Sequence, residues 1–189
     1  MNHLKVLTMS LLSLLCACRS SHAPLTTAQV DLPRFMGDWY VIANIPTRIE
    51  RGAHNAVESY RLDTDGSIAT TFTFRDGAFD GELKRYCPRG FVRDSNSNAI
   101  WGMQFIWPIK ADYRIVYVSA DYQRTIVGRE KRDNVWVMAR TPVLGEPELQ
   151  DLHDRVAREG YDMAEYAQVP QQWPEPEGAA PRSAEKDCS

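Results

Sequence analysis

Eight short apolar runs, separated by clusters of turn-forming residues, set the strongest limit on the fold of this chain. The runs are rich in β-branched and aromatic residues, and turn clusters such as Asp63-Thr64-Asp65-Gly66 interrupt them at regular spacing. Short runs in this arrangement are typical of antiparallel strands joined by hairpins. We expect strands over residues 38–45, 56–62, 67–74, 82–91, 99–106, 112–119, 124–130 and 135–140. Pro88 cannot donate to a strand ladder, so the fourth strand should have a bend or an edge there.

Eight antiparallel strands in hairpin order suit closure into an up-and-down β-barrel, which removes the free sheet edges. The predicted fold class is therefore all-β, and a barrel of eight strands has room inside for side chains or one small ligand. After the last strand, Gly145-Glu146-Pro147 marks a helix start and Gly160 a stop. Leu149, Leu152 and Val156 form one apolar stripe on that helix, which we expect to pack outside the barrel. A last short strand is expected within residues 161–169.

The first residues have the pattern of an export signal. Lys5 precedes an apolar run over residues 6–16, which is too short to cross a bilayer and is typical of a signal peptide. The run ends in Leu15-Cys16-Ala17-Cys18, which resembles the lipobox of bacterial lipoproteins. That resemblance implies a signal peptide over residues 1–17 and acyl chains on Cys18. Because Arg19 rather than Asp follows, it implies a lipid anchor in the outer membrane, facing the periplasm. An ordinary signal peptide, cut by the general signal peptidase, is the alternative.

The remaining boundaries follow from composition. Residues 18–32 are rich in Ser, Thr, Ala and Pro and read as a tether, and residues 33–170 form the single barrel domain. Residues 171–189 are rich in Pro, Glu, Ala and Ser, so we expect a flexible tail. The formal net charge of -3, without a run of Lys or Arg, argues against nucleic acid as a partner. The four cysteines lack metal-ligand spacing, so we expect neither a metal nor another cofactor.

Three short motifs carry a family resemblance. Gly37-Asp38-Trp39-Tyr40 precedes the first strand, Ser119-Ala120-Asp121-Tyr122 lies between the sixth and seventh, and Val137-Met138-Ala139-Arg140-Thr141-Pro142 ends the eighth. Together they resemble the three lipocalin motifs, with Ala120 in place of a threonine. Glu50-Arg51-Gly52 and Arg158-Glu159-Gly160-Tyr161-Asp162 are similar to the bacterial outer-membrane lipoprotein lipocalins. The resemblance covers roughly residues 33–170.

The lipocalin resemblance implies roles for the motif residues and a class of ligand. Gly37, Trp39 and Arg140 would be structural, with the Arg140 guanidinium packed on the Trp39 indole and capping carbonyls at the closed barrel end. The implied ligands are fatty acids or lysophospholipids, stored or carried in the bacterial cell envelope. Apolar residues at the open mouth would also allow a homodimer, although the sequence does not locate them.

Strand alternation selects the side chains that should face the interior. They are aromatic or aliphatic, and they suit a long apolar ligand with one polar end. The candidate ligand-binding residues are Phe72, Phe74, Trp101, Met103, Phe105, Tyr113, Ile115 and Tyr117. The alternative is that these side chains only fill the barrel as core. Glu58 shares a strand face with apolar residues, and the favoured interpretation places that face outward or Glu58 near the mouth.

Catalytic residues are not apparent. The sequence has no Gly-x-Ser-x-Gly or His-Glu-x-x-His motif, so we expect a binding protein rather than an enzyme. In many lipocalins a disulfide joins the fourth strand to the C-terminal segment, and the resemblance therefore implies a disulfide between Cys87 and Cys188. The alternatives are free thiols and a reactive Cys87. Two alternatives of function remain: an enzyme acting on an apolar substrate inside the barrel, and an envelope scaffold with a filled interior.

Overall fold

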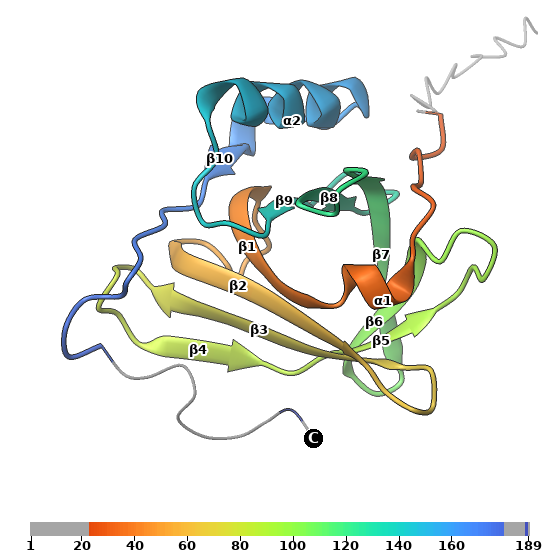
Figure 1. Cartoon of the computed structure of the whole chain (residues 1–189), viewed down its shortest axis with the longest axis horizontal. Coiled ribbons are helices and arrows are strands. Elements are labelled where there is room, and N and C mark those ends of the chain that lie inside the picture. Colours follow the sequence, from red (N-terminus) through yellow and green to blue (C-terminus); the bar gives the residue numbers. More distant parts are fainter. Residues whose placement is uncertain (1–22, 180–187, 189) are drawn as a thin grey trace, which may run out of the picture.

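The computed structural model describes residues 23–179 and residue 188. It shows one antiparallel sheet that curls into a barrel, with a helix across its outside (Figure 1). The order β1-β2-β3-β5-β6-β7-β8-β9 is closed by pairing of β1 with β9. The strands are β1 (Gly37–Ile45), β2 (Ala53–Leu62), β3 (Ile68–Asp76), β4 (Leu83–Tyr86), β5 (Arg89–Val92), β6 (Ile100–Ile106), β7 (Ile109–Val118), β8 (Arg124–Gly128), β9 (Val135–Ala139) and β10 (Ala167–Gln168). The predicted eight-stranded up-and-down barrel is confirmed.

The fourth predicted strand, 82–91, is divided into β4 and β5 around Cys87-Pro88. Both halves pair with β3, but only β5 also pairs with β6. This is the bend expected at a proline, which removes one donor from the ladder.

The alternation of side chains divides the core into two clusters. One fills the barrel, with Trp39, Phe74 and Trp101 among its buried members. The other lies between the sheet and α2 (Glu146–Arg158), where Leu152 and Val156 are buried against the barrel wall. The helix therefore packs outside the barrel through its apolar stripe, as the spacing of those residues predicts.

A bulge in β7 corrects the prediction for Tyr117. The register of β7 against β8 shifts between Ile115 and Tyr117, so that Val116 and Tyr117 both face outward. The Arg155 guanidinium of α2 lies over the Tyr117 ring, 4.2 Å from its centre. Regular alternation would place Tyr117 inside; the inserted residue reverses its side, and the ring packs under α2 instead of facing a ligand.

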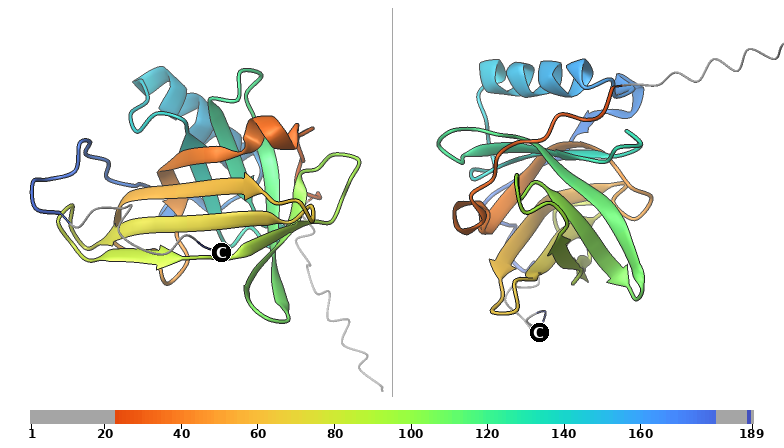
Figure 2. Two further views of the ribbon diagram at one scale, coloured as in Figure 1. Left: turned by 60° about the horizontal axis from the view of Figure 1, so that its bottom comes forward. Right: turned by 90° about the vertical axis from the view of Figure 1, so that its right-hand side faces the viewer.

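The expected tether, residues 18–32, is ordered and packed in its described part. Residues 23–31, here called the N-terminal strap, follow the outside of the barrel and lead to α1 (Leu32–Phe35), as the right-hand view of Figure 2 shows. The strap is held by backbone hydrogen bonds from Ala28 N–H to the Ile115 carbonyl, 2.9 Å, and from Val30 N–H to the Ser97 carbonyl, 2.8 Å. Its buried Leu25 and Val30 contribute to the core clusters, so the folded domain begins earlier than residue 33.

The expected tail, residues 171–189, is likewise attached to the barrel where it is described. The Gln172 N–H donates to Asn55 Oδ1 at 2.7 Å, and Glu175 forms an ion pair with the buried Arg75, 2.7 Å. A disulfide joins Cys87 to Cys188, which are 101 residues apart in sequence. The apolar composition of the segment is low, but specific polar contacts and a covalent bond hold it.

The predicted signal peptide and Cys18 lie outside the described residues. Within residues 23–179 and 188, no helix is long and apolar enough to cross a membrane.

Candidate functional site

The closed end of the barrel is sealed by an arginine on a tryptophan. The Arg140 guanidinium lies over the Trp39 ring, 3.7 Å from its centre, and donates hydrogen bonds to the carbonyls of Arg34, Phe35, Met36, Asp38 and Tyr122. Gly37 has φ +92°, and a Cβ there would lie 3.3 Å from Arg140 Nη1, so both the backbone and the close approach favour glycine. Gly37, Trp39 and Arg140 are therefore brought together as the resemblance implies.

The α1 helix adds a second plug that the sequence did not reveal. Phe35 is fully buried inside the barrel, and its carbonyl accepts the Trp39 Nε1–H at 2.8 Å. Its ring lies 5.0 Å from that of Trp39 and 5.6 Å from that of Trp101. The closed half of the barrel is thus solid with aromatic side chains, and the free volume lies toward the other end.

An apolar cavity of about 320 Å³ occupies the open half of the barrel. Its wall is formed by β2, β3, β6, β7 and β9 and by the connection between β1 and β2. The lining residues are Thr47, Arg48, Ile49, Glu50, Glu58, Phe72, Met103, Phe105, Ala111, Asp112, Tyr113, Arg129 and Trp136. Because apolar atoms dominate this wall, the cavity suits a hydrocarbon chain.

The predicted ligand-binding residues divide into three groups. Phe72, Met103, Phe105 and Tyr113 line the cavity. Phe74, Trp101 and Ile115 are buried in the barrel core but do not line the cavity, so the core-filling alternative holds for them. The Trp101 ring packs with Phe35 and Tyr60 in the closed half, whereas the Phe74 ring packs with Phe72 and Tyr86. Tyr117 lies outside, for the reason given above.

Glu58 faces the inner end of the cavity, which contradicts the favoured interpretation of an outward face or a position near the mouth. Its side chain is buried, and Tyr113 Oη donates to Glu58 Oε2 at 3.5 Å, while Tyr60 and Tyr113 share a hydrogen bond beneath it. Burial, together with a smaller contribution from the nearby Glu50, raises the pKa of Glu58 to about 7, against the hydrogen bonds from the two tyrosines. Among the residues described, no basic side chain forms an ion pair with it. The inner end of the cavity therefore carries a carboxyl that is neutral much of the time near pH 7.

A second acid, Glu50, is fixed in the cavity wall. Its Oε2 accepts hydrogen bonds from Trp136 Nε1 at 3.0 Å and from the Thr47 backbone N–H at 3.2 Å. Burial raises the pKa of Glu50, and both hydrogen bonds oppose that rise. Glu50 thereby holds the β1–β2 connection against β9 at the cavity entrance.

The cavity rim carries charges of both signs. Asp112 and Arg129 have partners, since Asp112 pairs with Arg114 at 3.1 Å and Arg129 pairs with Asp133 at 3.1 Å. Arg48 is exposed, and within the described part of the chain it forms no ion pair. The rim thus offers one cation to the polar end of a bound molecule, whereas the inner end offers an acid.

In residues 23–179 and 188, no three His, Cys, Asp or Glu side chains are placed to hold a metal ion. Glu50, Glu58 and Trp136 are cavity residues that the sequence reasoning did not place there. The signal for Glu58 was its position among apolar partners on one strand face, which indicates a buried acid as readily as an outward one.

The comparison with protein families agrees with the barrel and its motifs. The model of the lipocalin-like domain matches residues 30–171. The temperature-induced lipocalin-1 of Arabidopsis thaliana is 27% identical over 160 residues, covering 78% of this chain and 83% of that protein. The outer membrane lipoprotein Blc of Escherichia coli (strain K12) is 26% identical over 161 residues, covering 84% of this chain and 90% of that protein.

Solved structures show the same fold at lower identity. The major allergen Per a 4 from cockroaches has a TM-score of 0.60 at 16% identity, covering 80% of this chain and 94% of the allergen. Insecticyanin from the tobacco hornworm Manduca sexta has a TM-score of 0.61 at 12% identity, covering 78% of this chain and 84% of its own. At these identities the likeness concerns the arrangement of strands and helix.

Proposed function

Because the chain belongs to the family of lipocalin-like domains, we propose that it binds a single-chain amphipathic lipid, a fatty acid or a lysophospholipid, and carries it in the bacterial cell envelope. The observation that carries the proposal is the apolar cavity of about 320 Å³ in the open half of the barrel. The similarity to outer membrane lipoproteins supports the location, with the protein anchored through acyl chains on Cys18 and facing the periplasm.

The distribution of charge gives the bound lipid a direction. The hydrocarbon chain enters first and lies against Phe72, Met103 and Trp136, with its end near Glu58. The carboxylate or phosphate of the lipid stays at the rim, where Arg48 is exposed. The reverse orientation would bring an anion against the buried carboxyl of Glu58 at the inner end, which is unfavourable in a medium of low dielectric constant.

A titration with fluorescent fatty acid and fluorescent lysophospholipid tests the proposal. Ala111 lines the cavity, and the variant Ala111→Phe fills part of the free volume. We expect saturable binding to the wild type and an affinity at least about ten-fold weaker in Ala111→Phe. The hydrocarbon chain of the lipid and the new phenyl ring compete for the same space. Ala157→Phe, at an exposed position on α2, is the matched control. Absence of saturable binding of either lipid to the delipidated wild type would contradict the proposal.

We regard the protein as a carrier rather than an enzyme, but one observation favours the alternative. Glu58 is an acid with a pKa of about 7 that faces an apolar cavity and has a tyrosine beside it, which is a suitable environment for proton transfer. Mass spectrometry of the bound lipid before and after long incubation separates the two functions. An unchanged lipid mass is expected for a carrier. A change in lipid mass with the wild-type protein, and no change with Glu58→Gln, would identify an enzyme.

A further inference from the structure

The hairpin between β6 and β7 ends in an apolar tip that no described part of the chain covers. Phe105, Ile106, Trp107 and Ile109 are 53, 73, 83 and 71% exposed. One exposed apolar side chain is ordinary on a protein surface, but four neighbouring ones at a hairpin tip indicate an interaction site. The polar residue beside them is Lys110, whose ammonium lies over the Phe91 ring, 3.4 Å from its centre.

The apolar tip is continuous with the cavity. Met103 of β6 and Ala111 of β7 are paired and line the cavity, and Ile106 and Ile109 are paired farther along the same hairpin. Phe105 belongs to both surfaces, since it lines the cavity and is exposed outside. The tip therefore extends one wall of the cavity outward at the open end of the barrel.

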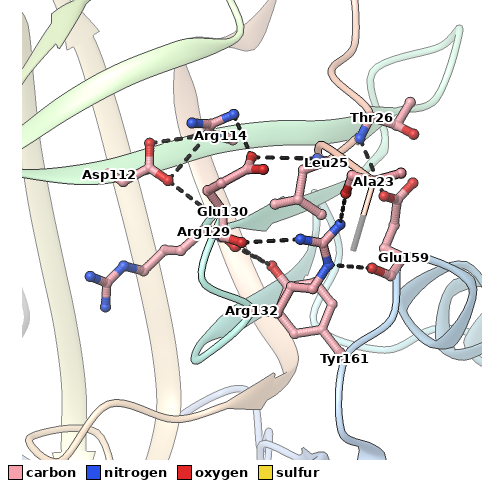
Figure 3. Close-up of polar contacts among 10 residues, drawn as sticks. All are labelled: Ala23, Leu25, Thr26, Asp112, Arg114, Arg129, Glu130, Arg132, Glu159 and Tyr161. Atoms are coloured by element: carbon pink, nitrogen blue, oxygen red, sulfur yellow. Dashed lines mark hydrogen bonds and ion pairs between the residues drawn. The ribbon is translucent and has the colours of Figure 1, made fainter. Parts of the chain in front are cut away.

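The N-terminal strap begins at the same open end. Arg132 lies in the connection between β8 and β9, which leaves the barrel beside the cavity-lining Arg129. Arg132 donates through Nη2 to the Ala23 carbonyl at 2.6 Å, through Nη1 to the Glu130 carbonyl at 3.0 Å and through Nε to the Glu159 carbonyl at 2.6 Å. Figure 3 shows the Arg132 guanidinium pointing into this group of acceptors, next to Ala23.

Two further contacts fix the start of the strap. The Leu25 N–H donates to Glu130 Oε2 at 3.4 Å, and Glu130 is itself paired with Arg114 at 2.6 Å (Figure 3). The Thr26 N–H donates to Glu159 Oε2 at 3.2 Å. In the right-hand view of Figure 2, the start of the described chain and the β6–β7 hairpin, in green, lie on the side of the barrel away from α1.

Only a short length of chain separates this point from the lipidation site of the proposed function. Five residues lead from Cys18 to Ala23, and even fully extended they span at most about 18 Å. Acyl chains on Cys18 would therefore hold the open end of the barrel, and not its closed end, next to the bilayer.

We propose that the β6–β7 tip docks on a phospholipid bilayer, with the mouth of the barrel facing the membrane. This inference rests on the lipid anchor of the proposed function and adds an orientation to it. Trp107 suits the headgroup level of a bilayer, where indoles concentrate, and the neighbouring Phe105, Ile106 and Ile109 lose their exposure to water there. A lipid chain then passes between the bilayer and the cavity along Phe105.

The depth of a spin label tests the docking directly. The full acylated protein is reconstituted in vesicles of phosphatidylethanolamine and phosphatidylglycerol, with a nitroxide on Trp107→Cys or, as the control, on Gln123→Cys. Gln123 is exposed in the connection from β7 to β8, at the closed end where its carbonyl accepts from the Arg140 N–H. Cys87 and Cys188 are joined and do not react with the label. The label at 107 should collide with oxygen in the lipid phase, and the label at 123 with an aqueous nickel complex.

A label at 107 that is as accessible to water as the label at 123 would overturn the orientation. Mass spectrometry of the same sample measures independently whether Cys18 carries acyl chains. Unmodified Cys18 would remove the anchor and this proposal with it, while lipid binding by the cavity would stand. Acylated Cys18 with a water-exposed label at 107 would overturn the docking alone.

A second measurement does not depend on the label. Ile106→Ser with Trp107→Ser removes the apolar tip, and Val143→Ser is the control at another strongly exposed apolar position. The rate at which the anchored protein takes a fluorescent fatty acid from the same vesicles should fall several-fold in the tip variant and stay unchanged in the control. The affinity for the fatty acid in detergent solution should be equal in all three proteins. Equal uptake rates would count against docking through the tip.

Discussion

The Arg140 guanidinium and the Trp39 indole are stacked at 3.7 Å, and both donate to the same carbonyl, that of Phe35. This relationship connects the end of β9, the start of β1 and the α1 helix in one arrangement. Each partner is needed for a different reason. The indole fills the barrel end, the guanidinium binds carbonyls at the end of α1, the start of β1 and the β7–β8 connection, and α1 brings Phe35 inside.

Arg140→Ala should therefore destabilise the barrel. A cation–π contact and several hydrogen bonds are lost together, so we expect a decrease of about 2–4 kcal/mol in the free energy of unfolding. Arg140→Lys keeps a charge near the indole but not the planar set of donors, and it should be intermediate. Urea denaturation measures all three proteins, and a stability of Arg140→Ala equal to that of the wild type would contradict the structural role.

Glu58 should make the stability of the protein depend on pH. The folded protein keeps the Glu58 proton up to a pKa of about 7, whereas the unfolded chain releases it near 4.5. Between these values the folded state binds more protons, so stability should fall as pH rises from about 4.5 to 7 and then level off. The full change is on the order of 3 kcal/mol.

Glu58→Gln is the variant that isolates this effect. Glutamine has nearly the same shape and no charge, so the slope of stability between pH 4.5 and 7 should be smaller than in the wild type. Burial also raises the pKa of Glu50, which adds a slope of the same sign to both proteins. The prediction therefore concerns the difference between the two urea-denaturation series, and two parallel series would refute it.

Arg48 should distinguish lipids by their charge. Its exposed guanidinium at the rim has no ion-pair partner within the described residues, so it is available to a carboxylate or phosphate. Arg48→Gln should weaken the binding of a fatty acid a few-fold, on the order of 0.5–1 kcal/mol for an exposed pair. A long-chain alcohol of equal length, measured by the same displacement titration, should bind both proteins equally. An equal loss for acid and alcohol would show that Arg48 acts through packing alone.

The disulfide between Cys87 and Cys188 should contribute strongly to stability. It closes a loop of 101 residues, for which the chain-entropy model gives about 4–5 kcal/mol. Reductant should lower the urea midpoint of the wild type, and Cys188→Ser should show the lowered midpoint without reductant. A midpoint that does not respond to reductant would contradict the contribution.

Arg132 should hold the N-terminal strap at the open end. Its φ is +55°, so Arg132→Asn is the suitable variant, because asparagine tolerates the left-handed region. Loss of the bonds to Ala23 and Glu159 should speed hydrogen exchange at Leu25 and Thr26, while the amide of Ala28, bonded to Ile115, keeps its protection. Unchanged exchange at Leu25 would show that burial of its side chain is sufficient.

The features that the sequence predicted correctly are those set by local pattern. The strands, the helix and the motif residues Gly37, Trp39 and Arg140 follow from alternation, turn chemistry and a family resemblance that the family model confirms. The outward position of Tyr117 could not be predicted in this way. A single inserted residue in β7 moves the Tyr117 side chain to the other face of the strand, and nothing in the composition of the strand marks that insertion.

Glu58 and Phe35 illustrate a second limit. The cost of burying an acid depends on its partners, and Tyr113, far away in sequence, supplies the hydrogen bond to Glu58. Phe35 lies between the segment expected as a tether, residues 18–32, and the first predicted strand, and a single turn of helix places its side chain inside the barrel. Both outcomes were decided by tertiary contacts that alternation and composition do not encode.

The N-terminal strap has a mechanical consequence. A force applied to the N-terminus reaches Arg132 and the ion pair of Glu130 with Arg114 before it reaches α1. The contacts of Arg132 and Glu130 with the strap therefore break first and can form again, while Phe35 stays packed inside the barrel. A pull on the N-terminus should therefore detach the strap before it disturbs the closed end of the barrel.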